Sequence, residues 1–226
     1  MNFFLSFIVA AVLGYFLGSI NSAIIVVRMF TGKDIRDMGS KNAGLTNTLR
    51  CAGKHCAVLT LVGDLLKGIV AVLLSRGFCH LVDAGLSPDN DTHYIGYIAG
   101  FFAILGHVFP LYYGFKGGKG VLVSAASLIA IDYKVLLASL LVFIVVLAIS
   151  KYVSLGSLIS SAYCPLATFL MSWIVDDYSL GRSLLYMFMC MPMMAMIIWM
   201  HRTNMQRLKD GNENKFSFKP IKIDKE

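Results

Sequence analysis

Apolar runs recur along almost the whole sequence, and they limit what this chain can fold into. A helix needs about 20 apolar residues to cross a bilayer, and the runs lie at 3–28, 56–76, 94–113, 120–132, 134–150, 155–175 and 183–201. Of the 226 residues, 57% are hydrophobic and 15% are charged, whereas soluble domains are roughly 45–50% apolar and a quarter charged. We therefore expect an all-α integral membrane protein with about seven transmembrane helices.

The run at 120–132 is shorter than the others. As a helix it would extend only about 20 Å, against a hydrocarbon core of about 30 Å. Two interpretations stay open, a short helix in a thinned or protein-lined region and a re-entrant segment.

The distribution of basic residues predicts the orientation of the chain. If all seven runs cross, one side collects the Lys and Arg residues of 28–54, 116–119, 151 and 202–225. Only Arg76, Lys134 and Arg182 fall on the other side, and Lys67 lies within the second run. Cytoplasmic loops are the positive ones, so we expect the N-terminus outside and the C-terminus in the cytoplasm. The prediction is one polytopic membrane domain over 1–226, with a polar cytoplasmic tail from about 202.

The first polar stretch on the basic side is GKDIRDMGSKNAGLTNTLR at 32–50. Gly, Ser, Asn and Thr together expose amides and hydroxyls, which suits an anion bound in a turn or at a helix start. An ordinary hydrophilic connector is equally open, because the same residues form turns. The candidate residues are Ser40, Asn42, Gly44, Thr46, Asn47 and Arg50.

The second stretch, GHVFPLYYGFKGGKG at 106–120, combines glycines with two lysines. It is not a Walker A loop, which has Ser or Thr after GK, so it predicts phosphate binding without nucleotide hydrolysis. A basic anchor beside a flexible turn is the alternative, and the histidine is open to a purely structural role. The candidates are His107, Lys116, Gly117, Gly118, Lys119 and Gly120.

Two further stretches, KYVSLGS at 151–157 and HRTNMQRLKDGNENK at 201–215, lie on the same side. Taken alone, each also fits a helix cap or a basic helix end. They contribute the candidates Ser154, Ser157, His201 and Asn204.

Asp64 and Lys67 lie three residues apart inside the second run. Charges at membrane depth are normally paired or functional, and both interpretations remain open. The methionine-rich run 187–200 fits an adaptable apolar filler, and no Cys or His pair converges there. We expect no metal, no cofactor and no nucleic acid partner.

In their order and spacing, these stretches resemble the bacterial acyl-phosphate:glycerol-3-phosphate acyltransferases, the PlsY family. The family shows GSIP, DIR..GSGNxGATNxxR, GHxFPxxxxFKGGKGVAT, VSLGS and HxxNxxRLxxGxExK. This chain has GSINS (18–22), DIRDMGSKNAGLTNTLR (34–50), GHVFPLYYGFKGGKGVLV (106–123), VSLGS (153–157) and HRTNMQRLKDGNENK (201–215). It departs from the pattern at Asn21, Lys41, Leu45, Leu122 and Val123, and Lys41 adds bulk and charge at a glycine position.

The resemblance implies an enzyme that transfers a fatty acyl group from acyl phosphate to the 1-hydroxyl of glycerol 3-phosphate. The products would be lysophosphatidic acid and phosphate, in the first step of phospholipid synthesis. It further implies a multi-pass protein of the bacterial inner membrane, with its active site facing the cytoplasm. The implied partners are the two substrates, membrane lipid and an enzyme that supplies acyl phosphate.

The roles of individual residues follow from the same resemblance. The catalytic set is Ser40, Arg50, Lys119, Ser154, His201 and Asn204. The substrate-binding set is Asn42, Gly44, Thr46, Asn47, His107, Lys116, Gly117, Gly118, Gly120 and Ser157. The general base is open between the substrate phosphate and His201. The alternative function is a membrane transporter of a phosphorylated metabolite.

Overall fold

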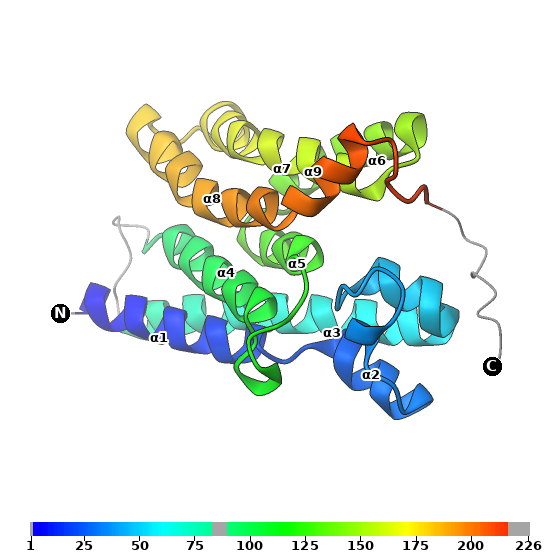
Figure 1. Ribbon diagram of the computed structural model, residues 1–226. Coiled ribbons are helices and arrows are strands. Elements are labelled where there is room, and N and C mark those ends of the chain that lie inside the picture. The colour runs from blue at the N-terminus through cyan, green and yellow to red at the C-terminus, as the bar shows by residue number, and fades with distance from the viewer. Residues whose placement is uncertain (1, 83–89, 217–226) are drawn as a thin grey trace, which may run out of the picture.

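The computed structural model describes residues 2–82 and 90–216, and over these residues the chain is helical without strands (Figure 1). This confirms the expected all-α class. The helices are α1 (Asn2–Gly18), α2 (Ser22–Thr31), α3 (Leu45–Leu81), α4 (His93–Val108), α5 (Val121–Ile131), α6 (Tyr133–Ser150), α7 (Val153–Leu170), α8 (Leu180–Met200) and α9 (Arg202–Lys209). The short turns are η1 (Ile35–Asp37), η2 (Leu111–Tyr113) and the π-helical η3 (Met171–Val175).

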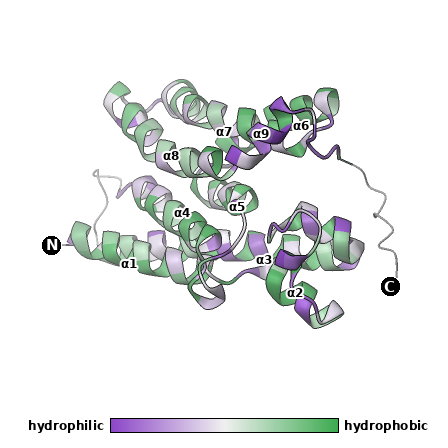
Figure 2. Cartoon of the chain, in the orientation of Figure 1, coloured by the Kyte–Doolittle hydropathy of each residue, from purple (hydrophilic) through white to green (hydrophobic). Residues whose placement is uncertain are grey.

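The helices form two layers with α5 between them (Figure 1). One layer contains α1 to α4, and the other contains α6 to α9. α5 contacts α3 and α4 on one side and α6 on the other. In the part of the chain that the structure describes, six segments are long and apolar enough to cross a membrane, counting Asn2–Thr31 as one. Polar residues gather at the end of the molecule that holds α9, η1 and the start of α3 (Figure 2).

The first apolar run, predicted at 3–28, forms one candidate span over Asn2–Thr31 that is built from two helices. α1 ends at Gly18 and α2 begins at Ser22, where the Asn21 side chain caps the new helix by accepting from the amide of Ile24 (3.1 Å). Gly18 packs directly on α4, since an added Cβ would lie 2.2 Å from the carbonyl oxygen of Ala103. Small residues allow such close backbone approach between membrane helices.

The short helix α5 lies between the two layers of helices (Figure 1). Its first residue follows the 106–120 loop, and at its other end the Arg76 guanidinium donates to the carbonyl of Ala130 (2.6 Å). The eleven residues span about 16 Å, which is shorter than the hydrocarbon core of a bilayer. A helix of this length can cross only where polar groups of the protein surround both of its ends. The structure therefore favours the short, protein-lined helix over the re-entrant segment.

α3 is longer than the predicted run of 56–76 and is bent near its start. Gly53 has a left-handed backbone (φ 82°) and separates the segment 45–52 from the long apolar part. The bend brings the first turn of α3 to the polar end of the molecule, beside the loop that precedes it. α9 also lies at that end and occupies the start of the predicted polar tail, whose residues 217–226 lie outside the described residues.

Candidate active site

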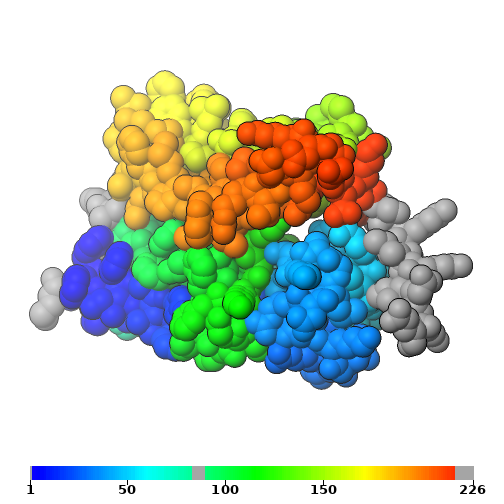
Figure 3. Space-filling model, in the orientation of Figure 1, coloured from blue at the N-terminus to red at the C-terminus, as the bar shows by residue number. Residues whose placement is uncertain are grey.

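A cavity of about 360 Å³ opens at the polar end of the molecule. Figure 3 shows the opening between the segment around α9 and the segment that leads into α3. The stretches that the sequence singled out converge here, although they are far apart along the chain. Of the predicted site residues, the lining contains Ser40, Asn42, Gly44, Thr46, Asn47, Arg50, His107, Lys119, Gly120, Ser154, Ser157, His201 and Asn204.

Lys116, Gly117 and Gly118 do not line the cavity. Lys116 is exposed, and its carbonyl accepts a hydrogen bond from Arg36 (3.1 Å). The amides of Gly117 and Gly118 donate to the carbonyls of Val108 (3.0 Å) and His107 (3.1 Å). These glycines permit close packing within the protein: an added Cβ on Gly118 would lie 2.2 Å from His107 Nε2.

Asn47 holds the loop in front of α3. Its buried amide nitrogen donates to the carbonyls of Met38 (3.0 Å) and Asn42 (3.1 Å), and its oxygen accepts from the amide of Ser40 (3.0 Å). A side-chain amide can satisfy several backbone groups at once. Although Asn47 borders the cavity, its hydrogen bonds shape the loop.

The start of α3 supplies groups suited to an anion. Gly44 is the N-cap and has no side chain to bond the first amides of the helix, which are open donors in any helix. The side chains of Ser40, Thr46 and Arg50 line the same space and have no hydrogen-bond partner within the described ranges. Helix amides and a fixed cation together favour phosphate.

Lys41, which departs from the family pattern at a glycine position, has a left-handed backbone with φ 58°. The loop therefore keeps the conformation that glycine adopts readily, and a bulky residue bears the strain. The exposed side chain does not line the cavity.

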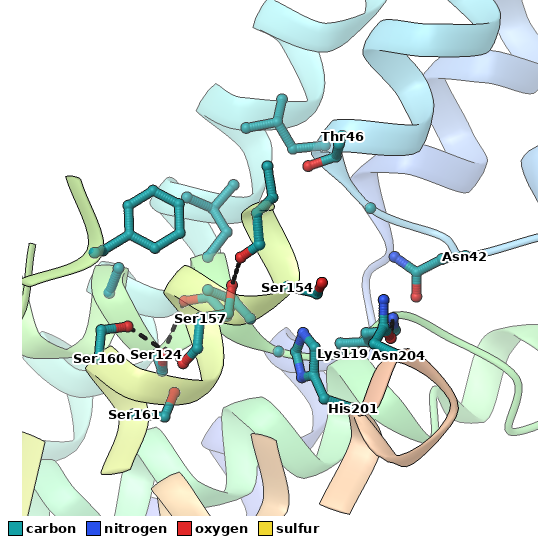
Figure 4. A pocket seen from close by; sticks show the side chains of 18 of the residues that line it. Asn42, Thr46, Lys119, Ser124, Ser154, Ser157, Ser160, Ser161, His201 and Asn204 are labelled. Carbon is teal, nitrogen blue, oxygen red and sulfur yellow. Dashed lines mark hydrogen bonds between the residues drawn. The ribbon is translucent and has the colours of Figure 1, made fainter. Parts of the chain in front are cut away.

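Across the cavity, one carboxylate organises the residues of α7 and α9. Glu213 Oε1 accepts from Ser154 Oγ (2.9 Å) and from Asn204 Nδ2 (2.7 Å), and Oε2 accepts from Arg207 Nε (2.7 Å). The oxygen of Asn204 in turn accepts from Lys119 Nζ. Figure 4 shows Lys119, Ser154, His201 and Asn204 facing Asn42 and Thr46 across the cavity.

Arg207 and Glu213 are not among the residues predicted from the sequence. The signal was present, because both residues match fixed letters in the HxxNxxRLxxGxExK motif. Their spacing from Asn204 does not reveal the contact, since the chain turns back after α9 before Glu213 meets Ser154 of α7.

Burial and neighbouring charges shift the pKa values of this group. Burial, together with the Arg207 charge, lowers the pKa of Lys119 to about 8. The pKa of Glu213 is also below its ordinary value: burial raises it, but the hydrogen bonds from Arg207, Asn204 and Ser154 outweigh that effect. Burial lowers the pKa of His201 to about 4, so its imidazole is neutral near pH 7.

The tautomer of His201 follows from its partner. Nδ1 lies 2.8 Å from the carbonyl oxygen of Ile197, and a carbonyl oxygen only accepts, so Nδ1 carries the hydrogen. Nε2 then keeps its lone pair. Since His201 borders the cavity, it offers a neutral hydrogen-bond acceptor beside Lys119 and Ser154.

Away from the polar mouth, the cavity continues between α5, α6, α7 and α8 as an apolar arm. Its lining there includes Leu122, Ala125, Leu128, Leu136, Leu140, Phe143 and Met194. Four hydroxyls that were not predicted from the sequence lie among them, from Ser124, Ser139, Ser160 and Ser161. Within the described residues, no group of three or more His, Cys, Asp or Glu side chains could hold a metal ion.

The fold and the cavity define a helical integral membrane protein whose polar pocket continues into an apolar arm. Residues 8–211 match the family model described as glycerol-3-phosphate acyltransferase, and the chain belongs to this family.

Curated relatives and solved structures agree with this assignment. The glycerol-3-phosphate acyltransferase of Clostridioides difficile is 39% identical over 95% of this chain and 97% of its own. The Pseudomonas putida relative of the same name is 39% identical over 91% and 97%. The crystal structure of the integral membrane glycerol 3-phosphate acyltransferase PlsY in its glycerol 3-phosphate form superposes with a TM-score of 0.75, at 32% identity over 94% of this chain and 96% of that one. Its lysophosphatidic acid form gives 0.74.

Proposed function

We propose that this protein transfers a fatty acyl group from acyl phosphate to the 1-hydroxyl of glycerol 3-phosphate, giving lysophosphatidic acid and phosphate. The observation that carries the proposal is a single cavity that joins phosphate-binding groups to an apolar arm. Both substrates present a phosphate, and one also carries a chain that belongs in hydrocarbon. The glycerol 3-phosphate and lysophosphatidic acid forms of the PlsY structure support the same acceptor and product.

The reaction needs positioning more than a strong nucleophile. The 1-hydroxyl oxygen bonds to the acyl carbonyl carbon, the bond from that carbon to the phosphate oxygen breaks, and the hydroxyl proton leaves on the phosphate. Acyl phosphate is already an activated anhydride, so the protein mainly holds two anions together and stabilises the carbonyl oxyanion. We assign Lys119, Arg50 and the first amides of α3 to this work.

The proton has two candidate acceptors, and their basicities differ. A phosphate has a second pKa near about 6, whereas the pKa of His201 is about 4. The phosphate oxygen is therefore the stronger base and takes the proton of the 1-hydroxyl, and His201 Nε2 positions the acceptor substrate by accepting a hydrogen bond from its 2-hydroxyl. We expect His201→Gln to keep reduced turnover. A variant with no turnover and an unchanged KM would assign the proton to His201.

The proposed location is the bacterial inner membrane, with the cavity open to the cytoplasm and the N-terminus outside. Two observations support this orientation. Hydrophilic residues concentrate at the end of the molecule with the cavity (Figure 2), and the side chain of Asn2 donates to the carbonyl of Val82 (2.7 Å) at the opposite end of α3. Membrane lipid and an enzyme that produces acyl phosphate are the partners that such a site requires. The transporter alternative has no support, because the anion-binding groups lie at one end of the bundle.

The first test offers palmitoyl phosphate, palmitoyl-CoA and palmitoyl-acyl carrier protein separately to the purified, detergent-solubilised protein with labelled glycerol 3-phosphate. We expect lysophosphatidic acid and released phosphate with palmitoyl phosphate alone. Lys119→Ala should abolish product, whereas Lys116→Ala, which removes an exposed lysine of the same loop, should retain it. Product from the thioesters alone would refute acyl phosphate as the donor. No product with any of the three donors would refute the acyltransferase activity.

A further inference from the structure

Two charged side chains of α3 lie buried below the cavity. Asp64 and Lys67 are one helical turn apart and almost fully enclosed, with side-chain exposures of 1% and 4%. Their charged groups pair at 2.8 Å between Asp64 Oδ1 and Lys67 Nζ. A buried pair of this kind costs desolvation energy, and at membrane depth it indicates a function. Asp64 borders the cavity.

Lys67 has two further partners. Nζ donates to the carbonyl of Ile20 (2.8 Å), where α1 breaks from α2, and it lies 2.8 Å from Nδ1 of His107. An ammonium group has three hydrogens and no lone pair. Asp64 Oδ1 pairs with this ammonium through charge, without a hydrogen bond of good geometry. Because the ammonium can only donate, Nδ1 of His107 must accept in their contact.

This contact fixes the tautomer of His107. A neutral imidazole that accepts at Nδ1 carries its hydrogen on Nε2. The ring lies against Gly118, next to the carbonyl of Ala43, and borders the cavity. Nε2 has no hydrogen-bond partner among the described residues. His107 therefore presents one unused donor beside the residue that precedes Lys119.

We propose that His107 donates its Nε2 hydrogen to a phosphate oxygen of a bound substrate, and that Asp64 and Lys67 are positioning residues that hold His107 in this tautomer. The inference rests on the proposed function and adds residues to its site. The opposite tautomer would place a lone pair against the phosphate and repel it.

The two histidines of the cavity are then set in opposite states. His201 donates from Nδ1 to a carbonyl and leaves Nε2 as an acceptor, whereas His107 accepts at Nδ1 and leaves Nε2 as a donor. A site that binds anions and orients a hydroxyl needs a hydrogen-bond donor for the anion and a hydrogen-bond acceptor for the hydroxyl. The backbone partner of His201 and the ion pair below His107 supply this difference.

The first experiment measures the tautomer directly. Protein with ¹⁵N-labelled histidine rings in detergent is examined by long-range proton–nitrogen NMR, which distinguishes Nε2–H from Nδ1–H. Of the five histidines, His107 is assigned by the signals that His107→Gln loses. We expect Nε2–H in the unchanged protein. The double variant Asp64→Leu/Lys67→Met, which removes both charges and leaves neither one unpaired, should gain an Nδ1–H population. An Nδ1–H or doubly protonated ring in the unchanged protein would overturn the proposal.

The second experiment compares two replacements of His107. Asparagine keeps an acceptor near the position of Nδ1 for Lys67 but has no donor at the position of Nε2, whereas glutamine places an amide N–H there. A hydrogen bond to a charged group predicts a loss of about 10- to 100-fold in kcat/KM for His107→Asn, with His107→Gln within a few-fold of the unchanged protein. Equal losses in both variants, or no loss in either, would overturn the donor role.

The KM values identify which phosphate His107 contacts. A raised KM for glycerol 3-phosphate alone assigns the acceptor substrate, and a raised KM for acyl phosphate alone assigns the donor substrate. Lys134→Met is the matched control, because it breaks an ion pair with Asp176 outside the cavity and should leave both KM values unchanged. The NMR measurement needs no turnover, so a failure of the proposed function leaves the tautomer result standing. If the enzyme is active but His107 carries its hydrogen on Nδ1, the result refutes the role of His107 and leaves the proposed function standing.

Discussion

Replacing Glu213 with alanine should release α9 and the chain after it from the cavity. The carboxylate accepts hydrogen bonds from Ser154 (2.9 Å), Asn204 (2.7 Å) and Arg207 (2.7 Å). The Glu213 side chain is 6% exposed and that of Arg207 is 37% exposed. Without the carboxylate, Arg207 and Lys119 face each other with no anion between them.

The magnitude follows from these contacts. A hydrogen bond to a buried charge contributes about 1.5–3 kcal/mol, and two such bonds come from Ser154 and Asn204. The Arg207 pair adds no more than about 1 kcal/mol, because water screens a partner this exposed. Since the three bonds share one acceptor and are not additive, we expect a loss of about 3–4 kcal/mol in the docking of α9.

Hydrogen exchange of the α9 amides, followed by mass spectrometry in detergent, measures this loss. Exchange should accelerate by about two to three orders of magnitude in Glu213→Ala, with turnover reduced because Asn204 and Lys119 move. Acid should have the same effect: a carboxylate whose pKa is lowered stabilises the folded state above its ordinary value of 4.5 and loses that contribution as the pH falls below it.

The matched control is Asp210→Asn, a carboxylate on the same segment that is exposed and accepts only from Gln206 (2.9 Å) among the described residues. It should leave the exchange of α9 unchanged. Unaltered exchange in Glu213→Ala, or equal acceleration in both variants, would refute the docking role of Glu213.

The other predictions concern the lysines and glycines of the site. Because the pKa of Lys119 is about 8, the KM for glycerol 3-phosphate should rise above that pH as the ammonium is lost, by up to about tenfold per unit, and a flat KM from pH 7 to 10 would contradict this. In Gly118→Ala, the Cβ meets His107 Nε2 at 2.2 Å, so the loop must shift and kcat should fall about 100-fold. Gly77→Ala, with open space around it and an ordinary helical backbone, should retain kcat, and similar losses in the two variants would exclude the contact as the cause. Lys41→Gly should raise the stability by up to about 1 kcal/mol by relieving the left-handed strain, measured by thermal unfolding, whereas an equal gain in Lys41→Ala would attribute it to the lost charge.

Much of the site could be predicted because its parts lie in short polar stretches between apolar runs. Charge asymmetry placed those stretches on one side, and the structure brings Arg50, Lys119, Ser154 and His201 to one cavity. Helix-forming apolar runs have few alternatives in lipid. The helical class and most helix positions follow from that constraint alone.

Other features depend on contacts that no local pattern contains. Gly117 and Gly118 look like a phosphate loop, but their amides bond the protein itself, because the chain folds back onto His107. The break at Asn21 lies inside a run that is apolar on both sides, and it depends on a cap and on the close approach of α4. In the sequence, Glu213 is one polar residue in a basic tail, and only the tertiary structure reveals its contact with Ser154.

The apolar arm that opens from the polar mouth has a kinetic consequence. A donor whose chain never leaves hydrocarbon reaches the cavity by lateral diffusion, so its effective concentration is its mole fraction in the membrane plane. Glycerol 3-phosphate arrives from water and obeys its bulk concentration. Adding inert lipid at a constant amount of acyl phosphate should therefore slow the reaction by surface dilution, and the apparent KM for glycerol 3-phosphate should stay the same.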